Sequence, residues 1–465
     1  MRAAHVLASR ALRPQAQDAL LALFIASTLL PARYAHAQTT TETPPAEQLI
    51  DRAETTTPET PPAAQPLERD ETTPEAPPTV RSLERIEVTG NTRTHPDVIL
   101  RALGVKEGEP VSTEDVPELE RRLINLRLFS AAKVALRPGA SGVVLEVGVV
   151  ERWTLLPVPF FNSSQGRTQA GLFLVETNLF GRRKQLAAGG TYSNRGSNGF
   201  VFYRDPSLGG SNWTLSASTF LGVTDRERVP VEVVLDSYRD ARYEASAQLG
   251  YQLTRELNVS GGLFGRILRP KARDGFATAP PPGGEAYGVT ASADYQGQTF
   301  RFFFNEGLNA RLQVDEGLDL AGSLPYRRVQ ASATYTHAVL GDHTLSFSGS
   351  FELSHGNPFR DTILLGGRMG SRGFVQGGLW AEEATTFTAE YQLPLWKPGW
   401  GVLTANAFVD AGVARWQGDP LTYATPGAGL RVYLRNVAIP ALGVDVTRAP
   451  TTHEVTVSVA AGVSL

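Results

Sequence analysis

From Trp153 to its last residue the sequence is built from short runs in which apolar and polar residues alternate, separated by turn residues. We count sixteen runs, the first at residues 168–178 and the last at 454–465, with one at 230–237 among them. In the last run one face is entirely apolar: Val455, Val457, Val459, Ala461, Val463 and Leu465. The opposite face carries only small or polar residues. This pattern predicts a mainly β structure with one face toward an apolar medium and one toward water.

The first 37 residues have the pattern of an export signal. Several Arg residues precede an apolar run at residues 19–30, and an A-x-A cleavage motif lies at residues 35–37. The apolar run is too short to span a bilayer as a helix, although a retained anchor is the alternative interpretation.

Because irregular backbone cannot face lipid, a membrane sheet must close on itself. We therefore expect a signal peptide at residues 1–37 and a sixteen-stranded antiparallel transmembrane β-barrel at residues 153–465. A soluble β-sandwich is the alternative.

Residues 38–83 are rich in Pro, Thr and acidic residues and contain little that could build a core. We expect a disordered linker that acts as a tether, with docking to peptidoglycan or a partner as the alternative. The formal net charge of −3 argues against nucleic acid as a partner. The absence of Cys excludes disulfides, thiol catalysis and Cys-based metal sites.

Residues 84–152 have the pattern of a small α/β domain. A strand with alternating Ile86 and Val88 precedes a helix that begins near Pro96. A second helix is expected from Ser112, with Asp115 as its capping-box partner. Two further strands follow, so the expected order is β-α-α-β-β.

This order resembles a POTRA domain, and so do the phrases RIEVTGNTRT at residues 85–94 and LRLFSAAKVAL at residues 126–136. The resemblance implies a periplasmic domain whose open sheet edge binds an unfolded client by adding a strand. A passive spacer that only positions the barrel is the alternative.

The stretch ILLGGRMGSRGF at residues 363–374 holds four glycines, so it predicts a loop of special shape. It resembles the sixth extracellular loop of BamA/TamA-family outer-membrane assembly proteins. The matching residues are Arg372, Gly373 and Phe374, preceded by the loop glycines Gly366, Gly367 and Gly370. Ser371 stands where the family usually has Val or Ile. An ordinary surface loop is the alternative.

Further phrases match the same family in order: ETNLFGRR (176–183), YRDPSLGGSNWTL (203–215), AEYQLPL (389–395) and FVDAGVAR (408–415). The resemblance covers residues 84–465. The chain departs from the family in its single POTRA-like domain and in its terminal Leu465, where an aromatic residue is usual.

Strand parity predicts which acidic side chains face the barrel interior. Phe387 and Tyr391 suit lipid, so Glu390 between them points inward, and the same argument turns Asp410 inward. Both match family positions that face the loop arginine, so the resemblance implies that Arg372 docks on these two carboxylates. Solvated lumen charges are the alternative.

We expect a weak lateral seam between the first and last strands, formed by Gly171, Leu172, Val459, Val463 and Leu465. The resemblance implies that this seam opens to insert other outer-membrane β-barrel proteins. The implied partners are unfolded outer-membrane protein clients, outer-membrane lipids and periplasmic or lipoprotein components. A secretion pore of the two-partner type and a passive porin or receptor are the alternatives.

Motifs for enzymatic chemistry are lacking: the sequence has no G-x-S-x-G, no G-x-x-x-x-G-K-[ST] and no H-E-x-x-H. His337 and His343 flank an expected turn and are interpreted as solvated. We therefore expect no enzymatic activity, no cofactor and no metal.

Overall fold

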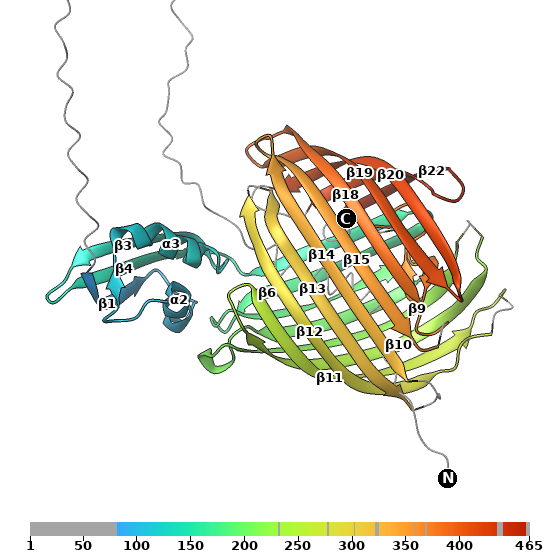
Figure 1. Cartoon of the computed structure of the whole chain (residues 1–465), viewed down its shortest axis with the longest axis horizontal. Coiled ribbons are helices and arrows are strands. Elements are labelled where there is room, and N and C mark those ends of the chain that lie inside the picture. The colour runs from blue at the N-terminus through green and yellow to red at the C-terminus, as the bar shows by residue number, and fades with distance from the viewer. Residues whose placement is uncertain are drawn as a thin grey trace, which may run out of the picture.

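The computed structural model describes residues 81–461, except 231–232, 277–278, 302, 321–324, 358, 368–369 and 435–439. The expected signal peptide at residues 1–37 lies outside the described residues. So does the expected linker at residues 38–83, except for its last three residues. The described chain forms a small α/β domain beside one end of a large barrel (Figure 1). We call this end of the barrel proximal and the opposite end distal.

The N-terminal domain is a four-stranded sheet with two helices packed against it. Its elements are β1 (Arg81–Thr89), α2 (Pro96–Leu103), β2 (Pro110–Val111), the 3₁₀ turn η1 (Thr113–Asp115), α3 (Val116–Ile124), β3 (Phe129–Pro138) and β4 (Val143–Glu151). The strand order is β2-β1-β4-β3. Ile99, Leu103 and Leu123 from the helices are completely buried with Leu145 of β4, so the helices and the sheet share one core.

The helix ends follow from local sequence. Pro96 occupies the first turn of α2, and Gly104 ends the helix in the left-handed conformation with φ 67°. Ser112 and Asp115 form both bonds of a capping box ahead of α3. These signals fix both ends of α2 and the beginning of the η1–α3 segment.

The predicted sixteen-stranded antiparallel barrel is confirmed. Its strands are β5 (Leu155–Ser164), β6 (Arg167–Leu179), β7 (Lys184–Ser193), β8 (Gly196–Asp205), β9 (Trp213–Arg228), β10 (Asp236–Gln252), β11 (Leu257–Ala272), β12 (Gly284–Arg301), β13 (Phe304–Asp319), β14 (Tyr326–Val339), β15 (His343–His355), β18 (Glu383–Trp396), β19 (Gly401–Trp416), β20 (Asp419–Leu434), β21 (Pro440–Arg448) and β22 (Val455–Ala461). A short 3₁₀ turn, η2 (Leu208–Gly210), lies between β8 and β9. Pairing of β22 with β5 closes the ring.

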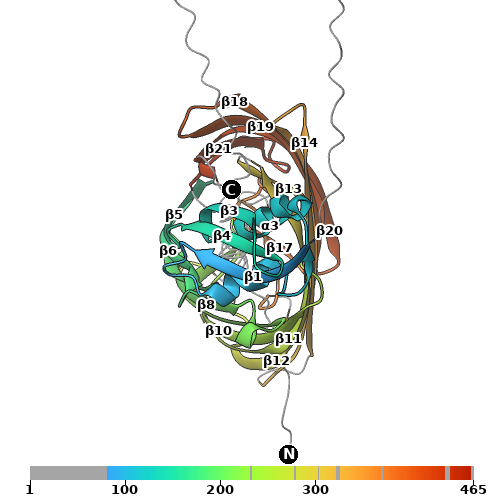
Figure 2. The same ribbon diagram turned by 90° about the vertical axis from the view of Figure 1, so that its left-hand side faces the viewer.

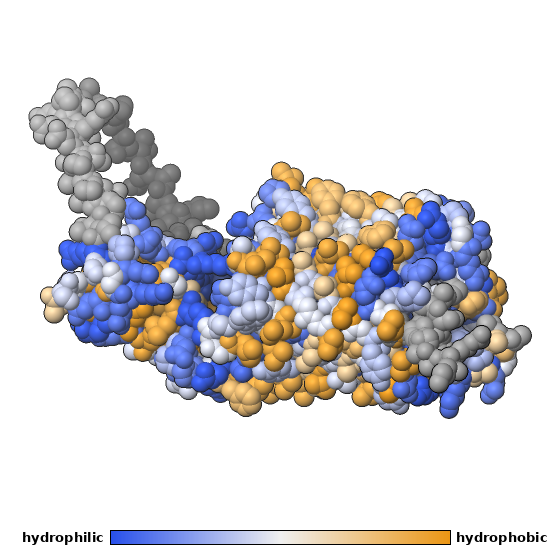
Figure 3. Space-filling view, turned by 60° about the horizontal axis from the view of Figure 1, so that its bottom comes forward, coloured by the Kyte–Doolittle hydropathy of each residue, from blue (hydrophilic) through white to orange (hydrophobic). Residues whose placement is uncertain are grey.

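The barrel wall has an apolar outside and a polar inside. On β18, Phe387 and Tyr391 are 46% and 36% exposed, whereas Thr388 and Glu390 between them are 2% and 7% exposed. Figure 3 shows apolar residues gathered over the middle of the outer wall and hydrophilic residues toward its ends. This arrangement matches the pattern expected of a wall that faces lipid. No helix among the described residues is long and apolar enough to cross a membrane.

Two expectations about individual strands are wrong. The first barrel strand is β5 and not residues 168–178, which belong to the second strand, β6. The run at 230–237 is not a strand of its own, because β9 ends at Arg228 and pairs directly with β10 from Asp236. The two errors cancel in the count.

The N-terminal domain is hydrogen-bonded to turns at the proximal end. The backbone N–H of His95 donates to the carbonyl of Gly181 at 2.8 Å, and the amide of Asn178 donates to the Thr94 hydroxyl at 3.0 Å. Arg101 of α2 donates to the Ser207 hydroxyl at 2.7 Å. These bonds join the domain to the turns that follow β6 and β8.

Candidate functional site

The connection from β15 to β18 folds back into the barrel instead of running over its distal rim. It contains a two-stranded hairpin, β16 (Ile363–Leu365) and β17 (Leu379–Ala381). Ile363 and Ala381 in this hairpin are 1% and 0% exposed. Figure 2, which looks from the side of the N-terminal domain, places β17 within the ring of strands. The loop therefore occupies the interior.

Ion pairs and aromatic contacts hold the base of this loop. Arg360 contacts Asp319 of β13, and Asp361 accepts from Arg266 of β11 at 2.8 Å. The Trp380 ring packs edge-to-face on Tyr238 of β10, with centroids 6.1 Å apart. The side chain of Trp380 is 2% exposed, so the loop is packed as firmly as a protein core.

Arg372 lies at the centre of a buried group of charges. Its Nε and Nη2 donate to the two carboxylate oxygens of Asp410 at 2.9 and 2.8 Å, and its backbone N–H donates to the same carboxylate at 3.0 Å. Its Nη1 donates to Glu390 and to Asp445, both at 3.1 Å. The guanidinium is planar and carries its donors in a fixed fork, so a single side chain can bridge all three acids.

Four neighbouring strands each supply one charged side chain to this group. Glu390 comes from β18, Asp410 from β19, Arg431 from β20 and Asp445 from β21. Arg431 donates to both oxygens of Glu390, at 2.5 and 3.0 Å, and to Asp445 at 3.3 Å. Two arginines thus share three carboxylates in the barrel interior. Removing one member would leave charges buried without a counter-charge, which is strongly destabilising.

The site contains two residues that the sequence analysis did not single out, Arg431 and Asp445. Strand parity was the signal available for them, since Val444 and Val446 face outward on either side of Asp445. Parity alone does not show which inward charges meet across several strands.

Gly373 and Phe374 fit closely against the wall beside Arg372. A Cβ atom on Gly373 would lie 2.7 Å from Cγ2 of Thr425 and 2.8 Å from Cδ of Pro450, so no side chain fits there. The Phe374 ring packs edge-to-face on Tyr423 with centroids 4.9 Å apart. The Tyr423 hydroxyl in turn donates to the carbonyl of Gly370 at 2.7 Å.

Ser371, which replaces the branched apolar residue usual in the family, has a role within the loop. It is completely buried, and its hydroxyl accepts from the backbone N–H of Gly366 at 3.0 Å. Gly366, Gly367 and Gly370 have positive φ angles of 110°, 67° and 85°. The turn is thus closed by a hydrogen bond that Val or Ile could not make.

The residues at the seam differ in part from those expected from the sequence. Val459 of β22 pairs with Ser163 of β5, so it lies on the seam. Gly171 and Leu172 do not, because they belong to β6 and pair with β5 on one side and β7 on the other. Val463 and Leu465 lie outside the described residues.

Metal-binding geometry is not found in the described part of the chain, where no group of three or more His, Asp or Glu side chains could hold an ion. His337 instead contacts Glu306 at 3.2 Å, and Nδ1 of His343 lies 2.5 Å from the Tyr391 hydroxyl.

A closed barrel with an apolar outer wall, an α/β domain at one end and a loop fastened inside the lumen defines a class of outer-membrane proteins. A model described as the Omp85 superfamily domain matches residues 178–433, and a POTRA model described as a surface antigen variable number repeat matches residues 82–152. The first match covers more than half of the sequence, and the chain therefore belongs to the Omp85 superfamily.

Solved structures with the same fold include BamA from Haemophilus ducreyi lacking POTRA domains 1–3, with a TM-score of 0.58, 15% identity and coverage of 82% of this chain and 84% of that chain. CdiB from Acinetobacter baumannii gives a TM-score of 0.59 at 15% identity, covering 82% of this chain and 74% of that chain. CdiB from Escherichia coli gives a TM-score of 0.59 at 15% identity, covering 82% of this chain and 76% of that chain. At this identity the likeness concerns the fold. A comparison with curated protein sequences gives no match.

Proposed function

We propose that this protein is an insertion factor for outer-membrane β-barrel proteins. In this proposal residues 1–37 direct export, and residues 38–83 act as a tether ahead of the N-terminal domain. Residues 84–152 form this domain, which lies in the periplasm and binds an extended client segment. The barrel of residues 153–465 then releases the client into the membrane through the seam between β5 and β22. The mechanism uses binding energy and needs no enzymatic chemistry.

The observation that carries the proposal is the sequence of β5 along this seam. β22 pairs with the last residues of β5, at Ser164, Ser163, Asn162 and Phe161. Pro157 and Pro159 lie further along the same strand, toward the proximal end of the seam. A junction that is short of ladder bonds is the place where a barrel opens with the least loss of free energy.

These two prolines weaken the seam. Pro157 and Pro159 both lie opposite residues of β6 in the ladder. Proline has no N–H and is tolerated in a strand only where its nitrogen faces away from the bonded neighbour. Both nitrogens therefore face the side of β22. A strand that pairs with this part of β5 therefore receives two hydrogen bonds fewer from β5, whatever its own sequence.

The N-terminal domain offers an edge on which a client could pair. β3 is the edge strand of its sheet, and no other described strand borders its outer side. The backbone N–H of Val134 in β3 donates to the carboxylate of Glu120 in α3 at 2.8 Å. Glu120 thus occupies one donor of this edge, and an incoming strand must displace it.

Reconstitution in liposomes tests the proposal. The purified chain is inserted into vesicles, a urea-unfolded outer-membrane barrel is added, and its folding rate is followed by its resistance to protease. We expect faster folding than in vesicles that contain no protein. A secretion pore or a passive porin would instead give ion conductance without accelerating folding, and that result would contradict the proposal.

A further inference from the structure

The segment Gly370–Gly378, which we call the crossing segment, is fastened to the wall on both sides of the seam. On the β19–β21 side it is held by the Arg372 charge group and by the hydrogen bond from Tyr423. Beyond Phe374 it runs toward β6 and β9. In the ring these strands lie on the other side of the β22–β5 junction.

Three hydrogen bonds hold the crossing segment on the β5 side. Gln165, in the turn between β5 and β6, donates to the carbonyl of Gly373 at 3.3 Å. Arg167, the first residue of β6, donates through Nη1 to the carbonyl of Gln376. The backbone N–H of Val229, which follows β9, donates to the carbonyl of Gly378 at 2.7 Å.

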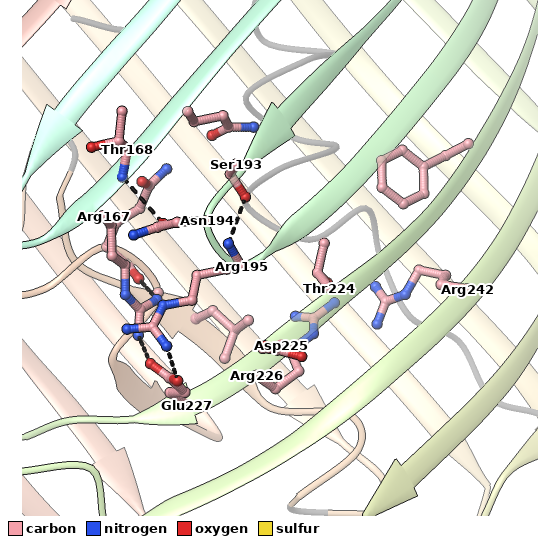
Figure 4. Close-up of a pocket in the computed structure, with 15 residues that line it drawn as sticks. Arg167, Thr168, Ser193, Asn194, Arg195, Thr224, Asp225, Arg226, Glu227 and Arg242 are labelled. Carbon is pink, nitrogen blue, oxygen red and sulfur yellow. Dashed lines mark hydrogen bonds and ion pairs between the residues drawn. The ribbon is translucent and has the colours of Figure 1, made fainter. Parts of the chain in front are cut away.

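Glu227 of β9 holds Arg167 in place for this contact. Arg167 Nη2 lies 3.0 Å from its carboxylate, and the guanidinium groups of Arg195 and Arg273 contact the same carboxylate. The side chain of Glu227 is 1% exposed and that of Arg167 is 10% exposed. In Figure 4 Arg167 and Arg195 both point to Glu227 beside a pocket that Gln376 and Gly377 also line. Buried charge-assisted bonds of this kind fix a side chain in one orientation.

We infer that the crossing segment holds the seam closed at its distal end by connecting the strands on its two sides. Arg167 is a positioning residue for this connection. The strand order supports it: β21 and β22 cannot move together away from β5 at the distal end unless the segment releases one of its two anchors. The Arg372 group alone cannot hold the seam, because all of its partners lie on β18–β21. Gln165, Arg167 and Val229 supply the attachment on the other side.

The inference concerns the mechanics of the seam, and it goes beyond the proposed function because it holds whether or not the protein inserts clients. Arg167→Ala removes one of the three hydrogen bonds of the second anchor, together with the ion pair to Glu227, and leaves Arg372 with all its partners. We expect hydrogen exchange of amides in β5 and β22 to rise about tenfold, which corresponds to ~1.4 kcal/mol of local opening free energy. Amides of β11–β14 are expected to exchange as in the unchanged protein. Arg167→Lys is expected to give an intermediate rise, because an ammonium cannot reproduce the guanidinium fork.

Arg311→Ala is the matched control, since Arg311 of β13 also forms an interior ion pair, with Asp294 at 3.1 Å, but far from the seam in the strand order. A covalent link between Ser163→Cys and Val459→Cys is expected to abolish the effect of Arg167→Ala on the seam. Equal seam exchange in Arg167→Ala and Arg311→Ala would overturn the inference, and so would a rise spread over the whole barrel. Client folding, measured on the same variants, tests the proposed function separately.

Discussion

The guanidinium of Arg372 binds the interior loop to the wall of the barrel. It donates four hydrogen bonds to three carboxylates, and its Cζ lies 3.2 Å from the centre of the Phe408 ring. Parity and the family resemblance together pointed to Glu390 and Asp410 from the sequence. The sequence analysis did not identify Arg431 and Asp445. Which inward side chains meet depends on strand register and tilt, and these are set by closure of the barrel and not by the local sequence pattern.

Replacing Arg372 by Ala leaves Glu390, Asp410 and Asp445 with one arginine among them. We expect the free energy of unfolding to fall by about 3–5 kcal/mol, the usual cost of leaving charges buried without a partner. The temperature at which the barrel loses its compact mobility in gel electrophoresis measures this fall. Arg372→Lys should lie in between, and Arg311→Ala serves as control. An unchanged transition temperature in Arg372→Ala would contradict the role given to the charge group.

Gly373→Ala tests the close approach beside Arg372. The added methyl group would press on Thr425 and Pro450, so we expect destabilisation of about 1–3 kcal/mol, typical of overpacking. Gly399→Ala is the control, because a Cβ at Gly399 meets nothing within 4 Å. The same gel measurement applies, and equal stability of the two variants would show that the wall yields at Gly373.

At the scale of elements, β5 shows the limit of reading strands from sequence. Pro157 and Pro159 argue against a strand interior, and only the position of β5 beside the seam makes them acceptable. The two N-terminal helices were predictable because Pro96 and the Ser112–Asp115 box are local signals. The boundary of a seam is not a local property, so the residues on β6 were assigned to it wrongly.

Glu120→Ala tests the edge of β3. Without its carboxylate the Val134 N–H is available to a client strand, so we expect tighter binding of a peptide copied from the last strand of a barrel. The gain of one hydrogen-bond donor should lower the Kd by about two- to tenfold. Fluorescence anisotropy with the full-length protein in detergent measures the Kd. Glu114→Ala, at an exposed neighbouring position, is the control. An unchanged Kd in Glu120→Ala would place client binding elsewhere.

Glu151 holds residues 92–94 of the N-terminal domain, and Thr94 and the next residue, His95, are bonded to the barrel. The contact between the domain and the barrel should therefore respond to acid through Glu151. Burial raises the pKa of Glu151, but hydrogen bonds from Thr94, Thr92 and Arg93 outweigh it and hold the pKa below its ordinary value of 4.5. A carboxylate whose pKa is lowered by folding stabilises above its unfolded pKa, and this stabilisation is lost as the pH falls through the folded value.

We therefore expect the domain to loosen from the barrel at pH values below about 4. The protein has no Cys, so spin labels at Thr113→Cys and Asp419→Cys report the domain-to-barrel distance without interference. The distance distribution should broaden in acid, and Glu151→Gln should show the broad distribution already at neutral pH. Equal widths at both pH values in the otherwise unchanged protein would contradict this assignment.

The whole molecule joins a small domain with an open sheet edge, a closed barrel and an interior loop that contacts strands on both sides of the β22–β5 junction. Alternation along the strands predicted the barrel, because one face against lipid and one against water is a general rule for its strands. The count of sixteen was right only because the missed strand β5 was offset by the extra run at 230–237. Which two strands close the ring is not a local property, so the junction of β22 with β5 became visible only in the assembled structure.

The account depends on the seam between β5 and β22 opening during activity. A disulfide between Ser163→Cys and Val459→Cys, which pair directly across the seam, locks it. The same bond between Val413→Cys and Thr422→Cys of β19 and β20 is the control. The measurement is the folding rate of an added client barrel in liposomes. The account predicts that the oxidised seam pair loses its acceleration and regains it on reduction, while the control pair stays active in both states. Full acceleration with the seam locked would contradict it.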